Sequence, residues 1–350
     1  MKNSLTARNK FFSIARLAFS PLVGISSCLV IISIFSKDAL QSISLLFTGT
    51  FTNTYYFGSM LNSATFLMTA GLGSAISVKS GNMNLGGEGQ IYLGGFLAGF
   101  FLSSSSNLSD PAVFIFTLIL VCASGACMAS ISALLKELRG AEVLLTTFLV
   151  SSAALPLIDG AITALKGNSS QNLLALPYIK DSFKFSQILS PSPLNFTFFL
   201  AIFLCISGYF ILNKTALGQR ISLWGKAPLF ATYSGLSSPF YSYLSLSISG
   251  ALHSLTGMIA VCGTYYTCHN GFYAGMGWNA LSVALISSSN PLALIASSLF
   301  LSWLYTSAGR VGLTQGFSFD ISGIIQGFIL FSVAITFASE NFNFRKKSAD

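Results

Sequence analysis

Long apolar runs separated by short polar connectors give the chain its dominant pattern. Stretches such as LAFSPLVGISSCLVIISIFS are long and continuous and do not alternate strictly between apolar and polar positions. A membrane-spanning helix needs about 20 mostly apolar residues, and backbone groups in lipid must find their hydrogen bonds within the chain. The pattern therefore predicts spanning helices. We expect them in the regions 17–36, 56–78, 88–103, 111–135, 141–165, 195–213, 240–262, 268–308 and 321–339.

The region 268–308 is too long for one span, and the pair Asn290–Pro291 divides it. Proline disfavours helix in the residue before it and is well tolerated at the first position of a new helix. We therefore predict two helices here, 268–288 and 291–308, which brings the expected number of spans to ten.

Composition supports this architecture. Hydrophobic residues make up 53% of the chain and charged residues only 8%, whereas about a quarter of the residues in a soluble globular protein are charged. So few charges cannot cover a water-facing surface. The predicted fold class is an all-α polytopic membrane protein with one membrane domain, 1–350. The first apolar run is too long for a signal peptide and no A-x-A-like site follows it, so we expect an uncleaved span.

The positive charges predict the orientation of the spans. With both termini cytoplasmic, the cytoplasmic side carries Lys2, Arg8, Lys10, Arg16, Lys79, Lys136, Arg139, Lys214, Arg220, Lys226, Arg345, Lys346 and Lys347. The outer side carries Lys37, Lys166, Lys180, Lys184 and Arg310. This bias follows the positive-inside rule. We expect a cell inner membrane protein with a cytoplasmic N-terminus (1–16), inner loop (214–239) and tail (340–350), and an irregular outer loop at 166–194.

Charge and motifs exclude several classes of function. The net charge of +8 admits nucleic-acid binding, but the cations lie beside the apolar runs, so we expect no nucleic-acid partner. The sequence has no G-x-x-x-x-G-K-[ST] phosphate loop, because Gly225–Lys226 continues into Ala227–Pro228. ATP, if it drives this protein, must bind another subunit. Two histidines and six cysteines without a CxxC pair offer no metal site, and we expect no cofactor.

The stretch GNMNLGGEGQ, residues 81–90, places Glu88 among four glycines at the start of an apolar run. The glycines allow neighbouring helices to approach closely, and a helix N-terminus favours a carboxylate. Glu88 is then either an interfacial cap, held by backbone N–H groups or by Lys79, or a polar group that faces a translocation path.

Two other acidic residues lie in or beside the region 141–165. Asp159 is within the apolar run, where an unpartnered acid costs several kcal/mol, so a polar cavity suits it better than lipid. Glu142 begins the run beside Arg139, and it is either a cap or ion-pair residue or a functional acid.

Three further residues are candidates for the substrate path. His253, near the middle of 240–262, either is satisfied by a neighbouring helix or donates to substrate. Trp278 and Asn279 lie where a broken helix could open a cavity. An aromatic ring with an amide suits stacking and edge recognition of a flat heterocycle, although tryptophan is also common at membrane interfaces.

The stretch NLGGEGQIYLGG resembles the N-[IL]-G-x-E-G-Q signature of permease subunits of ABC importers, in the branch that includes nucleoside and riboflavin permeases. The matching residues are Asn84, Leu85, Gly86, Glu88, Gly89 and Gln90. LRGAEVLLTTFL is similar to a second family motif, at Gly140, Glu142, Val143, Thr146 and Leu149. TALGQRISLWGKAPLFATYSGL resembles the family's cytoplasmic loop, at Gly218, Arg220, Gly225, Pro228, Ala231, Tyr233 and Gly235. GMGWNALSVALISSSNPLAL resembles a fourth motif, so the resemblance runs from about 60 to 335.

This resemblance implies a transport subunit and not an enzyme. It implies two permeases of the same or related chains, cytoplasmic ATPases and an extracytoplasmic substrate-binding protein, all at a lipid membrane. The ATPase would dock on 214–239, with Gly218, Arg220, Gly225 and Pro228 as coupling residues. The implied substrate is nucleoside-like or riboflavin-like, with simple sugars third. Departures at Ala141, Val150, Ser222 and 253–257 concern the substrate more than the fold.

Two other classes of protein remain open from the residues alone. An ion-coupled secondary transporter could use Asp159, Glu142 or Glu88 as proton carriers, but it leaves the basic inner loop without a role. An intramembrane serine hydrolase could use Ser249 and His253, four positions apart, but no oriented triad or nucleophile turn accompanies them.

Overall fold

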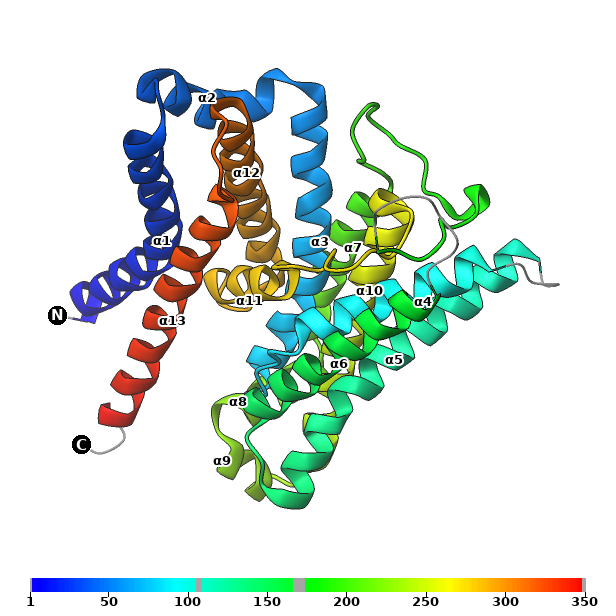
Figure 1. The fold of residues 1–350 in the computed structure, drawn as a ribbon. Helices are drawn as coiled ribbons and strands as arrows, with labels where there is room; N and C mark the ends of the chain where they lie inside the picture. The colour runs from blue at the N-terminus through cyan, green and yellow to red at the C-terminus, as the bar shows by residue number, and fades with distance from the viewer. Residues whose placement is uncertain (1, 105–108, 166–173, 348–350) are drawn as a thin grey trace.

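The structure, a computed structural model, describes residues 2–104, 109–165 and 174–347, and it is mainly helical there (Figure 1). The helices are α1 (Lys2–Phe35), α2 (Ala39–Thr52), α3 (Thr54–Lys79), α4 (Gly87–Ser103), α5 (Asp110–Arg139), α6 (Val143–Leu165), α7 (Thr197–Lys214), α8 (Ala216–Lys226), α9 (Pro228–Tyr233), α10 (Ser238–Ala260), α11 (Met276–Ile286), α12 (Pro291–Gln315) and α13 (Ile321–Lys347). A 3-10 turn, η1 (Asp181–Phe183), and a π-turn, η2 (Val261–Tyr265), complete them.

Six of the described helices are long and apolar enough to cross a membrane: α3, α5, α6, α7, α10 with η2, and α12. Three shorter apolar helices accompany them, at Phe19–Phe35, Met276–Ile286 and Ile321–Thr336. The predicted class, an all-α polytopic membrane protein, is therefore confirmed, whereas the predicted number of ten spans is not.

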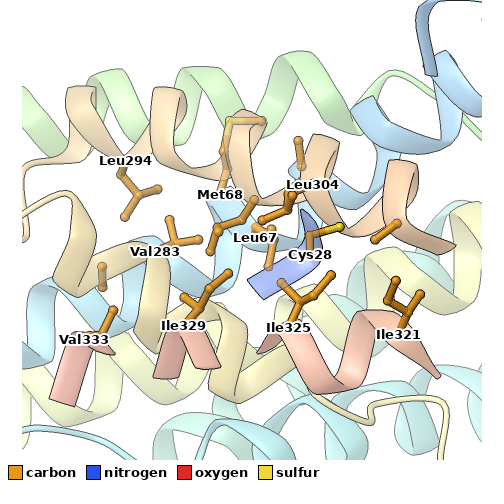
Figure 2. Packing of buried hydrophobic residues seen from close by; sticks show 14 of the residues in the cluster. Cys28, Leu67, Met68, Val283, Leu294, Leu304, Ile321, Ile325, Ile329 and Val333 are labelled. Atoms are coloured by element: carbon orange, nitrogen blue, oxygen red, sulfur yellow. The ribbon is translucent and has the colours of Figure 1, made fainter. Parts of the chain in front are cut away.

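Helix α3 lies at the centre of the fold, and 83% of its most apolar window is buried. Two clusters of buried side chains meet on it. The first joins Leu67 and Met68 of α3 to residues of α1, α11, α12 and α13 (Figure 2). The second joins Phe66 and Ala70 to residues of α4, α5, α6 and α10. Because successive residues of a helix point in different directions, α3 contributes side chains to both clusters.

The region 268–288 is not one helix, which corrects the prediction. After η2 the chain turns at Tyr266 (φ 57°) and continues without a long helix to Gly275 (φ 81°), where α11 begins. Gly271 (φ 75°) also takes the left-handed conformation that glycine adopts readily. The sequence before α11 carries a local signal for this break, because the polar pair His269–Asn270 is followed directly by Gly271. The 11 residues of α11 extend about 16 Å, roughly half a hydrocarbon core.

The predicted boundary at Asn290–Pro291 is confirmed. Pro291 occupies the first turn of α12, and the Asn290 side chain accepts a hydrogen bond from the Leu292 N–H at 3.1 Å. Asparagine is among the preferred N-cap residues. In Figure 1, α11 lies across α3 and α12, and the chain turns sharply between α11 and α12.

Several helices extend beyond the predicted apolar regions. The expected N-terminal segment 1–16 is helical from Lys2, as part of α1, and α13 continues through Lys347 into the expected tail. The inner loop 214–239 contains α8 and α9. Of the outer loop 166–194, the residues from 174 on are largely irregular, as expected, and 166–173 lie outside the described residues.

Helix α2 was not expected. Asp38 begins it by accepting a hydrogen bond from the Gln41 N–H at 3.1 Å. Its other end is held by Arg310 of α12, whose guanidinium donates to the Gly49 carbonyl and lies 4.5 Å from the Tyr56 ring centroid. A cation near a helix C-terminus is favourable.

The basic residues separate between the two ends of the bundle. Lys79, Lys136 and Lys214 lie at or near the ends of α3, α5 and α7 that adjoin α8, whereas Arg310 lies beside α2 at the opposite end of α3. Both chain termini lie on the side that carries α8 and α9 (Figure 1). An even number of crossings fits this arrangement.

Helices α4, α5 and α10 approach so closely that only glycine fits at their crossings. A Cβ atom at Gly257 of α10 would collide with the backbone of Ile91 in α4, and one at Gly250 would collide with the backbone of Gly125 in α5. Small residues at such crossings are typical of membrane helices, which associate through close packing.

We predict that Gly257→Ala lowers the free energy of unfolding by about 1–3 kcal/mol, because the added methyl group must push α4 from α10. Thermal unfolding of the purified protein in detergent measures this. Gly327→Ala on α13 is the matched control, since nothing lies within 4 Å of its Cβ position. Equal stability of the two variants would contradict the close approach of α4 and α10.

Candidate functional site

The segment 80–90, here called the motif segment, leads from the end of α3 into α4 and is held by a buried polar network. Asn84 and Gln90 pair through their amides: Asn84 Nδ2 donates to Gln90 Oε1 at 2.9 Å, and Gln90 Nε2 donates to Asn84 Oδ1 at 3.3 Å. Asn84 Nδ2 also donates to Ser249 Oγ of α10 at 3.0 Å. A network with its partners in place fixes one arrangement of the backbone.

Two hydroxyl groups of α6 clamp the motif segment from the other side. The Leu85 N–H donates to Thr147 Oγ1 at 3.0 Å, and the Gly89 N–H donates to Ser151 Oγ at 2.8 Å. A Cβ atom at Gly89 would lie 2.7 Å from Ser151 Oγ, and one at Gly86 would lie 2.9 Å from the Thr147 carbonyl. Glycine at these positions is therefore a condition for contact with α6.

Glu88 is 8% exposed and caps a helix other than its own. Its Oε1 accepts hydrogen bonds from the Gly277 N–H at 2.8 Å and the Trp278 N–H at 3.2 Å, in the first turn of α11. These N–H groups have no partners within α11, and a carboxylate at this end of a helix is favoured by the helix dipole. The predicted backbone N–H donors are thus present, but they belong to α11.

The predicted pairing of Glu88 with Lys79 is wrong. Lys79 Nζ donates to Asn213 Oδ1 at the end of α7, at 2.8 Å. Lys79 ends α3, on the near side of the motif segment, whereas Glu88 has already entered α4 and turned toward α11. A Cβ atom at Gly87 would lie 3.0 Å from Gly277 Cα, so the starts of α4 and α11 are in direct backbone contact.

His253 of α10 is fully buried beneath this contact. Its Nδ1 lies 2.8 Å from the Ser249 carbonyl and its Nε2 lies 3.2 Å from Ser74 Oγ of α3. A neutral ring that donates through Nδ1 and accepts through Nε2 satisfies both contacts. Both ring nitrogens therefore have protein partners, which agrees with the expectation that a neighbouring helix satisfies His253. Its role in the substrate path stays a prediction.

Asp159 lies in the last two turns of α6 and is half-buried. Tyr92 of α4 donates its hydroxyl to Asp159 Oδ1 at 2.5 Å. The Tyr92 ring is fully buried, with centroids 4.5 Å from Tyr273 and 5.7 Å from Phe272. No cation among the described residues pairs with Asp159.

Trp278 and Asn279 lie in the first turn of α11, next to the Glu88 cap. The Trp278 ring is 6.2 Å from that of Phe148 on α6. Asn279 Oδ1 is buried and has no hydrogen-bond partner among the described residues. Phe148 and Asp159 are eleven positions apart, about three helical turns, so they share one face of α6.

The structure thus divides the predicted site residues into separate groups. Asn84, Gly86, Gly89, Gln90, Glu88 and His253 form the buried junction of α3, α4, α6, α10 and α11. Asp159 contacts α4 and Trp278 contacts α6. Asn279 follows Trp278 in α11, with its Oδ1 buried. Glu142 is exposed at the start of α6, away from the Glu88 carboxylate cap.

The four predicted coupling residues lie on α8 and α9. Gly218 and Gly225 are contact points: a Cβ atom at Gly218 would collide with α7, and one at Gly225 with the Lys79 carbonyl. Arg220 is exposed on α8, and Pro228 begins α9. Trp224 anchors α8 by stacking on Tyr241 of α10, with ring centroids 6.4 Å apart.

Residues 56–334 match the family described as "Branched-chain amino acid transport system / permease component". This chain belongs to that family. The permease is 27% identical over 315 residues to the probable riboflavin import permease protein RfuC of Treponema pallidum. The aligned region covers 89% of this chain and 83% of the relative. It is 24% identical to the guanosine ABC transporter permease protein NupP of Bacillus subtilis, over 91% of this chain and 92% of the relative. It is 25% identical to the glucose ABC transporter permease protein TsgB13 of Haloferax volcanii, over 84% of this chain and 80% of the relative.

Membership of the family confirms the resemblance that the four motifs indicated. It makes the chain a permease subunit of a transport system and not a catalytic one. The motif that carried the resemblance most clearly, NLGGEGQ, is held by hydrogen bonds to α6, α10 and α11.

Sequence reasoning missed several residues around the site. Thr147 and Ser151 are hydroxyl residues on a long apolar helix, and their spacing on one face of α6 was the available signal. Ser249 was considered only as a possible nucleophile, whereas the structure makes it a partner of Asn84. Tyr92 was missed because its partner, Asp159, is far away in the sequence. Tyr273 was missed because it contacts the distant Tyr92 ring.

For the permease we predict that Glu88→Ala lowers the free energy of unfolding by about 2 kcal/mol, since two N–H groups of α11 lose a charged acceptor. Glu88→Gln should cost less, because the amide oxygen still accepts a hydrogen bond. Unfolding of purified variants measures both. Glu142→Ala removes an exposed acid and serves as the control. If Glu88→Ala is no less stable than Glu142→Ala, Glu88 does not hold α11.

Proposed function

We propose that this chain is the membrane-spanning permease subunit of an ATP-driven importer that moves a nucleoside-like or riboflavin-like solute inward, with ATP hydrolysed on a separate subunit. The observation that carries the proposal is the match of residues 56–334 to a family of transport permeases, on a chain with no phosphate-binding loop. Relatives named for riboflavin, guanosine and glucose support a small hydroxylated solute, and the first two favour a flat nitrogen heterocycle.

Helices α8 and α9 form the proposed docking segment for the ATPase. Helix α8 rests on the end of α3, where a Cβ atom at Gly81 would lie 3.1 Å from Gly225 Cα. Helix α9 then presents apolar side chains to its surroundings: Leu229, Phe230 and Tyr233 are 77%, 61% and 91% exposed. An exposed apolar cluster of this kind on a basic, membrane-adjacent segment is typical of a protein interface.

We predict that Phe230→Asp reduces substrate-stimulated ATP hydrolysis by about tenfold or more in the reconstituted transporter, because it places a charge in the centre of the proposed contact. The amount of permease in the membrane should not change, since Phe230 is not needed for the core. Gln219→Asp, which adds the same charge on the exposed face of α8, is the control. Full stimulation in Phe230→Asp would rule out α9 as the docking segment.

The partners in this proposal are an ABC ATPase, a second permease of the same or a related chain, an extracytoplasmic substrate-binding protein and membrane lipid. Helix α6 supports the need for a second permease: only 17% of its apolar window is buried, yet it carries Asp159. A carboxylate that faces lipid costs about 2.5–3.5 kcal/mol or more, so this face of α6 suits a path between subunits better than a lipid contact.

We propose that the substrate path includes Asp159, Trp278, Asn279 and His253. Asp159, Trp278 and Asn279 have partial exposure in this structure, which supports a direct role. The enclosed ring of His253 would act through the motif segment, unless the junction opens during transport.

The proposed topology is ten crossings, with α11 and its preceding segment as a broken crossing and with both termini in the cytoplasm of a cell inner membrane. The cation bias supports it, as do the ends of α1 and α13, which lie toward the side of the bundle that carries α8 and α9. Labelling of a Ser348→Cys variant only after the membrane is permeabilised agrees with this orientation, and labelling from outside intact cells does not.

Uptake measurements test the proposed function directly. Proteoliposomes are prepared with the permease and its ATPase, and with the binding protein on the side of the membrane opposite to the ATPase. They should transport a radiolabelled nucleoside or riboflavin only when ATP is present on the ATPase side. Uptake that needs an ion gradient and no ATP would support the alternative, an ion-coupled transporter. That alternative is not favoured, because Glu88 and Asp159 are engaged in hydrogen bonds to α11 and Tyr92.

A further inference from the structure

We propose that Asp159 and Tyr273 recognise a flat nitrogen heterocycle, and that the free oxygen of Asp159 accepts a ring N–H that lies next to a carbonyl. They lie at one end of a strip that continues along the same face of α6 to Phe148 and Trp278, about three helical turns away. This inference rests on the proposed function, because it assigns the substrate class to particular atoms of the path. It adds Tyr273 and Phe148, and the orienting role of Tyr92, to the residues considered so far.

The first argument is the position of the carboxylate. Asp159 lies in the outer part of a helix whose apolar window is mostly unburied within this chain. An acid in a spanning segment is costly in lipid, so its face must meet water, protein or a ligand. The adjacent Pro156 lies inside α6 and has no N–H to give to the Ser152 carbonyl. Two hydrogen-bond acceptors are thus available on one side of α6.

The second argument is the way Asp159 is held. Among the described residues its carboxylate receives one hydrogen bond, from Tyr92 to Oδ1. The Tyr92 ring is itself fixed, since it is fully buried against Tyr273 and Phe272. Oδ1 is therefore occupied and Oδ2 is free of described donors. A carboxylate oriented in this way is ready to accept one more N–H or O–H group.

The third argument is the aromatic surface beside the carboxylate. Tyr273 is partly exposed and is inclined by 39° to the Tyr92 ring. Further along the same face of α6, Phe148 meets Trp278. Aromatic side chains bind the faces of flat heterocycles by stacking, with little preference among them. The selectivity of the strip must then come from the acceptor, Asp159.

The chemistry of the acceptor defines the substrate class. A carboxylate can accept from a lactam N–H, as in guanine, or from an imide N–H, as in the isoalloxazine ring, and it loses that hydrogen bond when the ring nitrogen is methylated. A site built around a hydrogen bond rejects the analogue that lacks the donor more strongly than an apolar pocket does. A simple sugar offers hydroxyl donors but no face of the kind that stacks on Tyr273.

The test compares uptake of guanosine with 1-methylguanosine, and of riboflavin with 3-methylriboflavin, by the complete reconstituted transporter. Each substrate is used at a concentration that saturates the binding protein. Every permease variant is tested with the same binding protein, so the binding protein's own preference between substrates cancels when variants are compared. We expect the wild-type permease to favour the unmethylated member of the transported pair by about tenfold or more. Asp159→Asn should reduce this preference to about twofold or less.

Tyr273→Leu should lower uptake of both members of the pair while the preference between them remains. Tyr92→Phe keeps the carboxylate and removes only its fixed donor, so it should reduce the preference several-fold, and it carries the test if Asp159→Asn does not accumulate. Asp181→Asn is the matched control: this outer acid is exposed and paired with Lys184 at 2.6 Å, outside the strip. Its preference should equal that of the wild type.

The outcomes separate this inference from the proposed function. ATP-dependent uptake with an unchanged preference in both Asp159→Asn and Tyr92→Phe overturns the inference alone. ATP-dependent uptake of glucose but of neither heterocycle overturns the inference and the proposed substrate class, and leaves only the ATP-driven importer. If Asp159→Asn assembles no second permease, the carboxylate belongs to a subunit contact and the inference is wrong. Wild-type permease with no ATP-dependent uptake of any of these solutes overturns the proposed function and the inference together.

Discussion

The carboxylate of Glu88 against the first turn of α11 is the interaction on which the rest of the site depends. Helix α11 has only 11 residues, so within a membrane its free N–H groups cannot reach water at a bilayer surface. An unpaired backbone group costs several kcal/mol there. Glu88 supplies the acceptor for two of them, and this fixes where α11 begins, where Trp278 points and how α4 and α11 meet.

The glycines and hydroxyl groups around Glu88 follow from this constraint. Gly87 lets the two helix starts touch, while Thr147 and Ser151 hold the motif segment against α6. The same segment begins at the turn on which Gly225 and α8 rest. The proposed docking segment for the ATPase and the cap of α11 are therefore joined by one short, hydrogen-bonded connector, through which we propose that ATP hydrolysis is coupled to the substrate path.

Sequence reasoning predicted what depends on local pattern. The long apolar helices, the Asn290–Pro291 boundary and the presence of backbone donors to Glu88 were all expected and are present. It could not predict that those donors lie on α11, because the contact joins residues 189 positions apart. It also placed a helix from 268 on, since hydropathy measures apolarity and not the backbone conformation that Gly271 and Gly275 adopt.

Hydrogen exchange at the Gly277 and Trp278 amides tests the central claim most directly. In the wild-type permease both amides should exchange slowly, because Glu88 accepts their hydrogen bonds. In Glu88→Ala they should exchange at least about tenfold faster, since local opening sets exchange rates. The Leu292 amide, capped by Asn290 in α12, should not change. Unaltered protection at Gly277 and Trp278 in Glu88→Ala would contradict the account.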